Sequence, residues 1–135
     1  MPHNRIIGWF DGAAQLNGDL SGAGGVIKVD EHTVYRWTLN CGGGTYTRVE
    51  ILGAWAALSL AHRVSITDFH VIGDSKIVIE WLNNKGYLRV ISIDCWKEKI
   101  KELFNHFSII TFAHVYREEN LEADILSKNA LITHP

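Results

Sequence analysis

The chain has 135 residues, a formal net charge of −2, 47% hydrophobic residues and two cysteines. Its length predicts one domain, residues 1–135, around a single core. The small net charge gives no sign of a polyanionic partner, the N-terminus lacks the pattern of a signal peptide, and no apolar run approaches the ~20 residues that span a membrane. We therefore expect an intracellular, cytoplasmic protein with no membrane partner. Cys41 and Cys95 lack zinc-site spacing, and we expect them to be reduced.

The first forty residues predict three strands. The apolar residues from Ile6 to Phe10 indicate a buried strand that ends at Asp11. The stretch SGAGGVIKV is followed by β-branched residues and not by a helical pattern, which favours a strand over 24–29 and disfavours a phosphate-binding loop. TVYRWTLN alternates in polarity and predicts a third strand over 33–40. The short turns between these strands predict an antiparallel meander.

The rest of the chain alternates between helical and extended patterns. The expected elements are a long buried helix over 47–64, a strand over 69–72, a helix over 75–82, an amphipathic helix over 94–107, a strand over 108–117 and a last helix from Asn120. A meander followed by βαβ units predicts an α/β fold, with a mixed five-stranded sheet and helices on both faces.

Four acidic residues lie where these elements begin or end: Asp11, Glu50, Asp74 and Asp124. Each has a local explanation. Asp11 and the next glycine form a common hairpin-turn dipeptide, and Thr47 to Glu50 fits an S/T-x-x-E capping box. Asp74 can cap the following helix, and Asp124 suits the positive end of its helix dipole. Taken one at a time, the acids leave these explanations open.

Taken together, the four acids favour a metal site. In a sheet of this order the first strand is central and lies beside the fourth, so Asp11 and Asp74 point to one edge, which Glu50 and Asp124 can reach from helices. Crowded carboxylates raise one another's pKa unless cations neutralise them. Mg²⁺ prefers oxygen ligands, and two such ions can drive in-line cleavage of a phosphodiester. We therefore expect Mg²⁺ at this edge.

The sequence blocks that contain these acids carry a family resemblance. FDGAAQLNGDLSGAGGVI, TYTRVEILGAWAAL, VIGDSKIVIEWL and HVYREENLEADILSK together resemble the type 1 ribonuclease H domain. They are most similar to its short branch, found in archaea, in bacteria and in reverse-transcriptase-like plant domains. The blocks follow the family's order and spacing over nearly the whole chain.

The resemblance implies a fold and an activity. It predicts the ribonuclease H-like fold and a metal-dependent endoribonuclease that cleaves the RNA strand of an RNA/DNA hybrid, leaving a 5′-phosphate and a 3′-hydroxyl. It implies two Mg²⁺ ions, for which Mn²⁺ can substitute. Asp11 would contact both ions, Asp124 the ion that holds the attacking water, and Glu50 and Asp74 the ion near the leaving oxygen. The resemblance points to no protein partner, and we expect a monomer.

The resemblance also implies contacts with the hybrid. Tyr46 and Thr47 stand where many members have two asparagines, so the hydrogen bonds to the DNA strand must differ. The backbone at Gly12 and Ala13 is expected to let the RNA strand approach closely. The residues expected to bind the hybrid are Gly12, Ala13, Asn17, Thr45, Tyr46, Thr47 and Arg117.

Two positions near the last helix have alternative interpretations. Arg117 can approach a phosphate, or it can pair with Glu118 or Glu119 on the surface. The chain from Val115 to the last helix is too short for the mobile histidine loop of many members. We therefore expect His114 to be a strand histidine without a catalytic role.

The basic protrusion of the longer members is also missing or reduced to Lys85 and Arg89. Fewer phosphate contacts predict weaker binding of the hybrid and a shallower dependence on salt. Trp81 can stack on the DNA strand, but its place on an amphipathic helix favours the core.

Three other functions or explanations remain open. A related nuclease with a similar acidic site can act on DNA or on single strands, although the order Asp, Glu, Asp, Asp favours ribonuclease H. A non-catalytic nucleic-acid-binding module can share the fold, although it has no need of four crowded acids. If the acids are only helix caps, Mg²⁺ will not change the stability of the protein.

Overall fold

The computed structural model of the protein describes residues 5–15, 19–84 and 94–132. Helices and strands follow one another in the order that the sequence predicts. They are β1 (Ile6–Ala14), β2 (Ser21–Lys28), β3 (Val34–Gly42), α1 (Tyr46–Arg63), β4 (Asp68–Gly73), α2 (Lys76–Leu82), α3 (Asp94–Phe104), β5 (Ile109–His114), the 3₁₀ turn η2 (Arg117–Glu119) and α4 (Leu121–Ile132).

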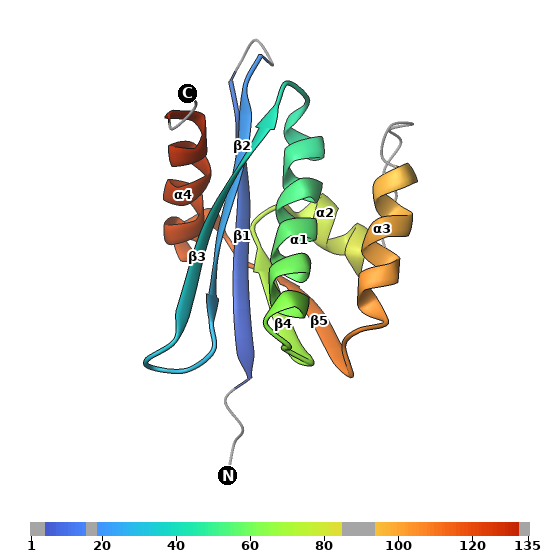
Figure 1. Cartoon of the computed structure of the whole chain (residues 1–135). Coiled ribbons are helices and arrows are strands. Elements are labelled where there is room, and N and C mark those ends of the chain that lie inside the picture. The colour runs from blue at the N-terminus through green and yellow to red at the C-terminus, as the bar shows by residue number, and fades with distance from the viewer. Residues whose placement is uncertain (1–4, 16–18, 85–93, 133–135) are drawn as a thin grey trace.

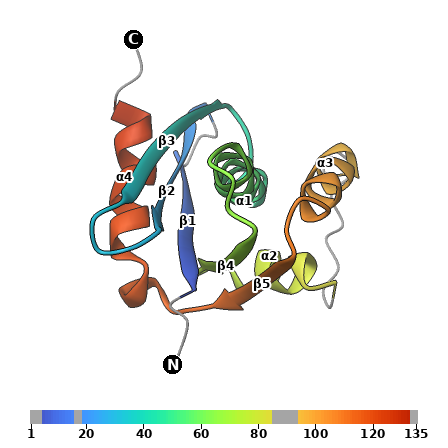
Figure 2. The same cartoon turned by 60° about the horizontal axis from the view of Figure 1, so that its bottom comes forward.

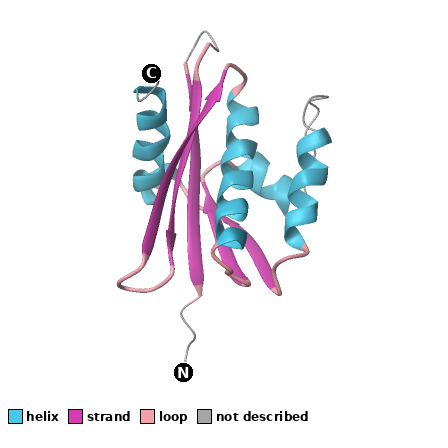
Figure 3. Ribbon diagram, viewed as in Figure 1, coloured by secondary structure: helices cyan, strands magenta, loops and turns pink. Residues whose placement is uncertain are grey.

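The strands form one mixed sheet, as predicted. Their order is β3-β2-β1-β4-β5, so β1 is central and β4 lies beside it (Figures 1 and 3). The pairs β1/β2 and β2/β3 are antiparallel, whereas β1/β4 and β4/β5 are parallel. Because β1 and β4 are parallel, their C-terminal ends meet at the same edge of the sheet.

Helices cover both faces of the sheet. Helix α4 lies on one face, and α1, α2 and α3 lie on the other (Figure 2). The glycines of β2 explain how α4 packs, because a Cβ atom on Gly24 would lie 2.4 Å from the backbone nitrogen of Ser127. The glycine-rich stretch is therefore a strand against which a helix backbone packs, and not a phosphate-binding loop.

The main core lies between the sheet and the three helices α1 to α3. Phe10 and Phe69 from the sheet, Leu58 from α1 and Ile100 from α3 are among its fully or almost fully buried side chains. Apolar burial of this kind is the dominant stabilising contribution in a small domain. Trp81 is partly buried against this core, as predicted from its helix.

Strand β1 differs from the prediction because Asp11 lies inside it and not at its end. The antiparallel pairing with β2 continues from Asp11 opposite Gly24 to Ala14 opposite Ser21. The proposed hairpin turn at Asp11 and the following glycine is therefore wrong, and β2 begins at Ser21 and not at residue 24. A turn dipeptide can stay extended where a partner strand supplies its hydrogen bonds.

Other boundaries differ by a few residues. Helix α3 ends at Phe104 and β5 at His114, before the predicted limits of 107 and 117.

Cys41 is a half-buried free thiol. No described helix is long and apolar enough to cross a membrane.

Candidate active site

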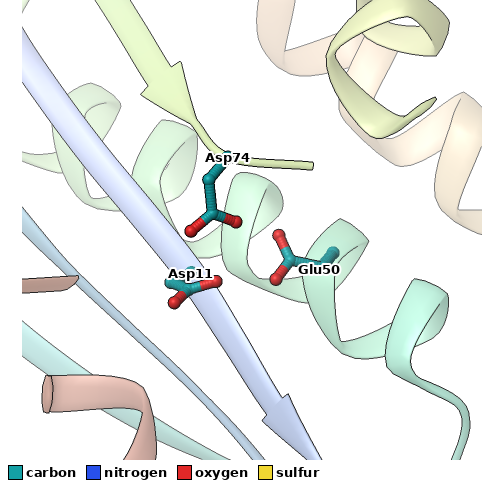
Figure 4. Close-up of side chains that lie close together, drawn as sticks. All are labelled: Asp11, Glu50 and Asp74. Carbon is teal, nitrogen blue, oxygen red and sulfur yellow. The ribbon is translucent and has the colours of Figure 1, made fainter. Parts of the chain in front are cut away.

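Three of the four acids come together where β1, β4 and α1 meet. Asp11 projects from the central strand, Asp74 follows the last residue of β4, and Glu50 projects from α1 (Figure 4). One carboxylate oxygen from each lies within 4.8 Å of those from the other two. The convergence predicted from the strand order is confirmed for these three residues.

Glu50 is not part of a capping box. Helix α1 begins at Tyr46, and its N-cap is Thr45, whose side chain accepts a hydrogen bond from the Arg48 nitrogen at 3.2 Å. The proposed cap at Thr47 is therefore wrong, and Glu50 lies beyond the first turn, fully buried. With no capping role, Glu50 needs another explanation for a buried charge.

Asp74 is not a helix cap either. Ser75 is the N-cap of α2 and makes no side-chain cap hydrogen bond. The Asp74 side chain is half-buried and instead points toward Asp11 and Glu50 (Figure 4). The local explanation for this carboxylate is also wrong.

Gly12 joins the two buried acids. Its backbone nitrogen lies 2.8 Å from Glu50 Oε1 and 2.9 Å from Asp11 Oδ1, and donates to both. A Cβ atom at this position would lie 2.8 Å from Val49 Cγ1 and 3.1 Å from the Glu50 nitrogen. The glycine is therefore needed for α1 to approach β1 closely enough to place Glu50 over Asp11.

The buried carboxyls hold their protons unusually strongly. Burial is the main cause that raises the pKa of Asp11 to about 7, and the neighbouring Asp74 and Asp124 contribute to the increase. Burial, followed by the nearby Asp11 and Asp74, raises the pKa of Glu50 well above its usual range. Glu50 Oε2 is buried and has no hydrogen-bond partner. The negative charge of these carboxylates is therefore not balanced within the site. A shared proton or a bound cation would balance it.

The donor set fits a hard divalent cation. All the converging ligands are carboxylate oxygens, which Mg²⁺ and Mn²⁺ accept, and Glu50 Oε2 is a buried oxygen free to coordinate. Asp11, Glu50 and Asp74 could hold such an ion. In the part of the chain that the structure describes, none of these three carboxylates forms an ion pair with a lysine or arginine.

Asp124 lies beside this group rather than in it. It projects from the first turn of α4, where the helix dipole favours a negative charge, and one oxygen forms a 3.0 Å ion pair with Lys128. A hydrogen bond shared with Asp124 is one of the causes that raise the pKa of Asp11. The fourth acid is therefore next to Asp11 but has a cationic partner of its own.

Asn120 is a site residue that the sequence reasoning missed. It is buried at the start of α4, and its Nδ2 donates to the Phe10 carbonyl oxygen at 2.9 Å and approaches Asp74 Oδ2 at 3.5 Å. Asn120 was recognised only as the start of a helix. An asparagine four residues before Asp124 is the one sequence feature that points to the site, because residues four apart share a helix face.

Two of the expected substrate-binding residues lie at the mouth of the site. Tyr46 is 43% exposed, and the pKa of its phenol is raised by burial of the ring and then by the charges of Glu50 and Asp11. Arg117 is exposed in η2, and Tyr46, followed by Asp74, raises the pKa of its guanidinium. Among the described residues, no ion pair joins Arg117 to its acidic neighbours. The alternative of a surface ion pair is therefore not supported.

The remaining expected residues are less informative. Ala13 and Thr47 are half-buried, and Thr45 is exposed at the N-terminus of α1. Asn17, and the Lys85 and Arg89 of the reduced protrusion, lie outside the described residues.

His114 is the last residue of β5, which confirms that it is a strand histidine. Its Nε2 lies 3.2 Å from the backbone oxygen of Asp74. Since a carbonyl oxygen can only accept, this contact is a hydrogen bond in the tautomer that carries the proton on Nε2. In that tautomer the bond ties the end of β5 to the end of β4.

Comparison with known proteins adds a family to this geometry. A family model described as reverse transcriptase-like matches residues 9–130. No curated protein matches the chain.

Several solved structures share the fold. The ribonuclease H1 of the halophilic archaeon Halobacterium salinarum has a TM-score of 0.89 at 25% identity, covering 97% of this chain and 100% of its own. The N-terminal ribonuclease H domain of a Mycobacterium tuberculosis protein has a TM-score of 0.86 at 26% identity, covering 93% and 98%. LC11 ribonuclease H1, isolated from compost and solved with an RNA/DNA hybrid, has a TM-score of 0.85 at 22% identity, covering 95% and 97%.

These likenesses agree with the fold described above. The chain belongs to the reverse transcriptase-like family of ribonuclease H-like domains.

Proposed function

We propose that this protein is a metal-dependent endoribonuclease that cleaves the RNA strand of RNA/DNA hybrids, leaving a 5′-phosphate and a 3′-hydroxyl. The observation that carries the proposal is the group Asp11, Glu50 and Asp74, buried or half-buried within 4.8 Å of one another and without a basic partner among the described residues. Membership of a ribonuclease H-like family, and a similar structure solved with such a hybrid, support the choice of substrate.

Each acid has a proposed role. Asp11 and Asp124 would hold one Mg²⁺ ion, and Asp11, Glu50 and Asp74 a second, with Mn²⁺ as a substitute. When bound, the ions supply activation of the attacking water and stabilisation of the charge on the leaving oxygen. Gly12 keeps Glu50 and Asp11 in place through its nitrogen, which donates to both carboxylates. Lys128 fixes one oxygen of Asp124 through their ion pair.

The hybrid would bind around this edge of the sheet. Arg117 is exposed beside the acids, where its charge can hold a phosphate. Tyr46 is half-exposed at the mouth of the site, where its ring can stack on a sugar or base and its hydroxyl can donate to the substrate. We also assign hybrid contacts to Gly12, Ala13, Thr45 and Thr47, and to Asn17 beyond the described part of the chain.

The test is a cleavage assay with an end-labelled RNA/DNA hybrid in Mg²⁺ or Mn²⁺. Double-stranded RNA, double-stranded DNA and single-stranded RNA serve as alternative substrates, and Asp11→Asn is the inactive control. We expect cleavage of the RNA strand of the hybrid alone, and no cleavage above background with Asp11→Asn. Size-exclusion chromatography of the same preparation tests the proposed monomer.

The other outcomes point to the rival functions. Cleavage of DNA or single-stranded RNA at a comparable rate would identify a related nuclease. A folded protein that binds the hybrid and leaves it intact with either metal would identify a binding module. A thermal midpoint unchanged by Mg²⁺ would reduce the acids to structural residues.

A further inference from the structure

Asn120 connects the elements that carry the acids. Its Nδ2 donates to the carbonyl oxygen of Phe10, the residue before Asp11, at 2.9 Å. The same nitrogen lies 3.5 Å from Asp74 Oδ2, and the backbone oxygen of Asn120 accepts from the Asp124 nitrogen at 3.1 Å. One residue therefore contacts β1, the end of β4 and the first turn of α4.

The chemistry of these contacts fixes the orientation of the amide. Both neighbours of Nδ2, a carbonyl oxygen and a carboxylate oxygen, are acceptors, so rotating the amide would put Asn120 Oδ1 against two oxygens. The side chain is 2% exposed, and its Oδ1 has no partner. Burying an amide oxygen that accepts no hydrogen bond lowers the stability of the fold. Packing alone therefore does not explain why an asparagine is buried at this position.

The acids need a fixing group of this kind. In the metal-free chain the charge of Asp74 repels Asp11 and Glu50, and it raises the pKa of both. Asp74 is the least buried of the three, and it follows the end of its strand. An N–H donor that approaches Asp74 Oδ2 limits rotation of the carboxylate.

We propose that Asn120 is a positioning residue of the acidic site: its amide nitrogen orients the Asp74 carboxylate toward the metal and locks the backbone before Asp11 to the N-terminus of α4. Asn120 touches neither the reacting phosphate nor the metal in this role. The inference rests on the proposed function, since it concerns the geometry that metal binding and hydrolysis require.

The experiment compares Asn120→Leu, which keeps most of the volume, and Asn120→Ala with the parent protein. Hydrolysis of the hybrid gives kcat and KM, and the thermal midpoint is measured against Mg²⁺ concentration. We expect kcat to fall roughly 10- to 100-fold, as for groups that orient metal ligands, with KM within about twofold of the parent. The Mg²⁺ concentration that gives half of the stabilisation should rise roughly tenfold.

Ile66→Ala is the control for lost stability. Ile66 is buried before the N-terminal end of β4, away from Asp74, and its truncation destabilises the fold without touching the acids. At a temperature where all variants are folded, this control should keep the kcat and the Mg²⁺ response of the parent. Equal losses in Ile66→Ala, or a parental Mg²⁺ response in both Asn120 variants, would overturn the inference.

The two readouts separate this inference from the proposed function. A parent that is stabilised by Mg²⁺ but leaves the hybrid intact contradicts the proposed function, and the Mg²⁺ titrations still decide the role of Asn120. A parent that neither cleaves nor responds to Mg²⁺ overturns both.

Discussion

The two ends of β4 carry opposite kinds of polar cluster. At its N-terminal end, the Arg5 guanidinium lies 2.7 Å from Asp68 Oδ1, so each charge has a partner; we call this the paired end (Arg5 and Asp68). At its C-terminal end lies the acidic end (Asp11, Glu50 and Asp74), where three carboxylates lie within 4.8 Å and none has a basic partner among the described residues. The same strand thus joins a balanced cluster to an unbalanced one.

The difference shows which cluster opposes folding. The paired end is half-exposed and adds a little stability, because its charges attract each other in a well-solvated place. The acidic end buries Asp11 and Glu50 with like charges beside them, which lowers the stability of the metal-free chain. A ligand that supplies positive charge would offset that loss, as the proposed metal binding requires.

The largest expected effect comes from neutralising the most buried acid. Glu50→Gln keeps the acceptor for the Gly12 nitrogen but removes the buried charge, so hydrolysis should fall roughly a hundredfold or more. The same variant should be more stable than the parent in metal-free buffer at pH 8, by about 1–4 kcal/mol. Activity assays and denaturant titrations check the two halves of this prediction.

Opposite signs for activity and stability are the essential point. A Glu50→Gln protein that loses both activity and metal-free stability would mean that the charged carboxylate supports the fold. The contrast between the two ends of β4 would then be broken.

The next effect is a fall in metal-free stability as the pH rises. Asp11 has its pKa raised from 3.8 to about 7 in the folded protein, so between these values the unfolded chain loses the proton and the folded chain keeps it. The stability that the Asp11 carboxyl contributes is then fully present below about pH 4 and is lost as the pH rises through about 7. The raised pKa of Glu50 acts in the same direction. We expect the thermal midpoint to fall by roughly 5 °C or more between pH 4 and pH 8.

Mg²⁺ and a point variant of the protein serve as controls for this pH dependence. Saturating Mg²⁺ should restore the midpoint at pH 8 and change it little at pH 4, where Asp11 and Glu50 hold their protons. Asp30 acts in the opposite direction, because backbone hydrogen bonds from residues 32 and 33 lower its pKa. The profile is therefore read as the difference between the parent and Asp11→Asn, which lacks this titration, and a flat difference would contradict the prediction.

A smaller effect is expected from filling the contact between β1 and α1. In Gly12→Ala the new Cβ would press on Val49 Cγ1 and on the Glu50 backbone, so α1 must shift away from β1. We expect a loss of about 1–3 kcal/mol in the free energy of unfolding, and a weaker Mg²⁺ response because Glu50 moves with the helix. Thermal melting with and without Mg²⁺ measures both. A variant as stable as the parent would show that the contact between β1 and α1 leaves room for a methyl group.

Much of the fold could be predicted because the patterns that define it are local. Alternating polarity, buried helical periodicity and short turns gave the strand order, and the order placed β1 beside β4. From that placement the meeting of Asp11 with Asp74 followed directly. The extent of β1 could not be predicted, because Asp11 stays extended only through its pairing with Gly24.

Details of the site depend on contacts between distant residues. The capping box at Thr47 was a reasonable local pattern, but α1 begins before it because Thr45 supplies the cap. Asn120 reaches Phe10 across 110 positions of sequence, so its spacing from Asp124 points to the site but its contact with β1 could not be predicted. The raised pKa of Glu50 could not be predicted either, because its main cause is burial, and this burial depends on how α1 packs over Gly12.

The smallest expected effect belongs to the paired end. Asp68→Asn removes one charge of a half-exposed pair but leaves Arg5 its hydrogen bonds to Thr111 Oγ1 at 2.8 Å and to the Phe69 oxygen at 3.2 Å. The loss should be about 0–1 kcal/mol, falling further in high salt, with hydrolysis and the Mg²⁺ response unchanged. Since β4 continues from Asp68 to the acidic end, a change in kcat would mean that the two ends are coupled through the strand. A kcat equal to that of the parent would show that the absence of a charged partner affects hydrolysis only where the charges are buried, as they are at the acidic end.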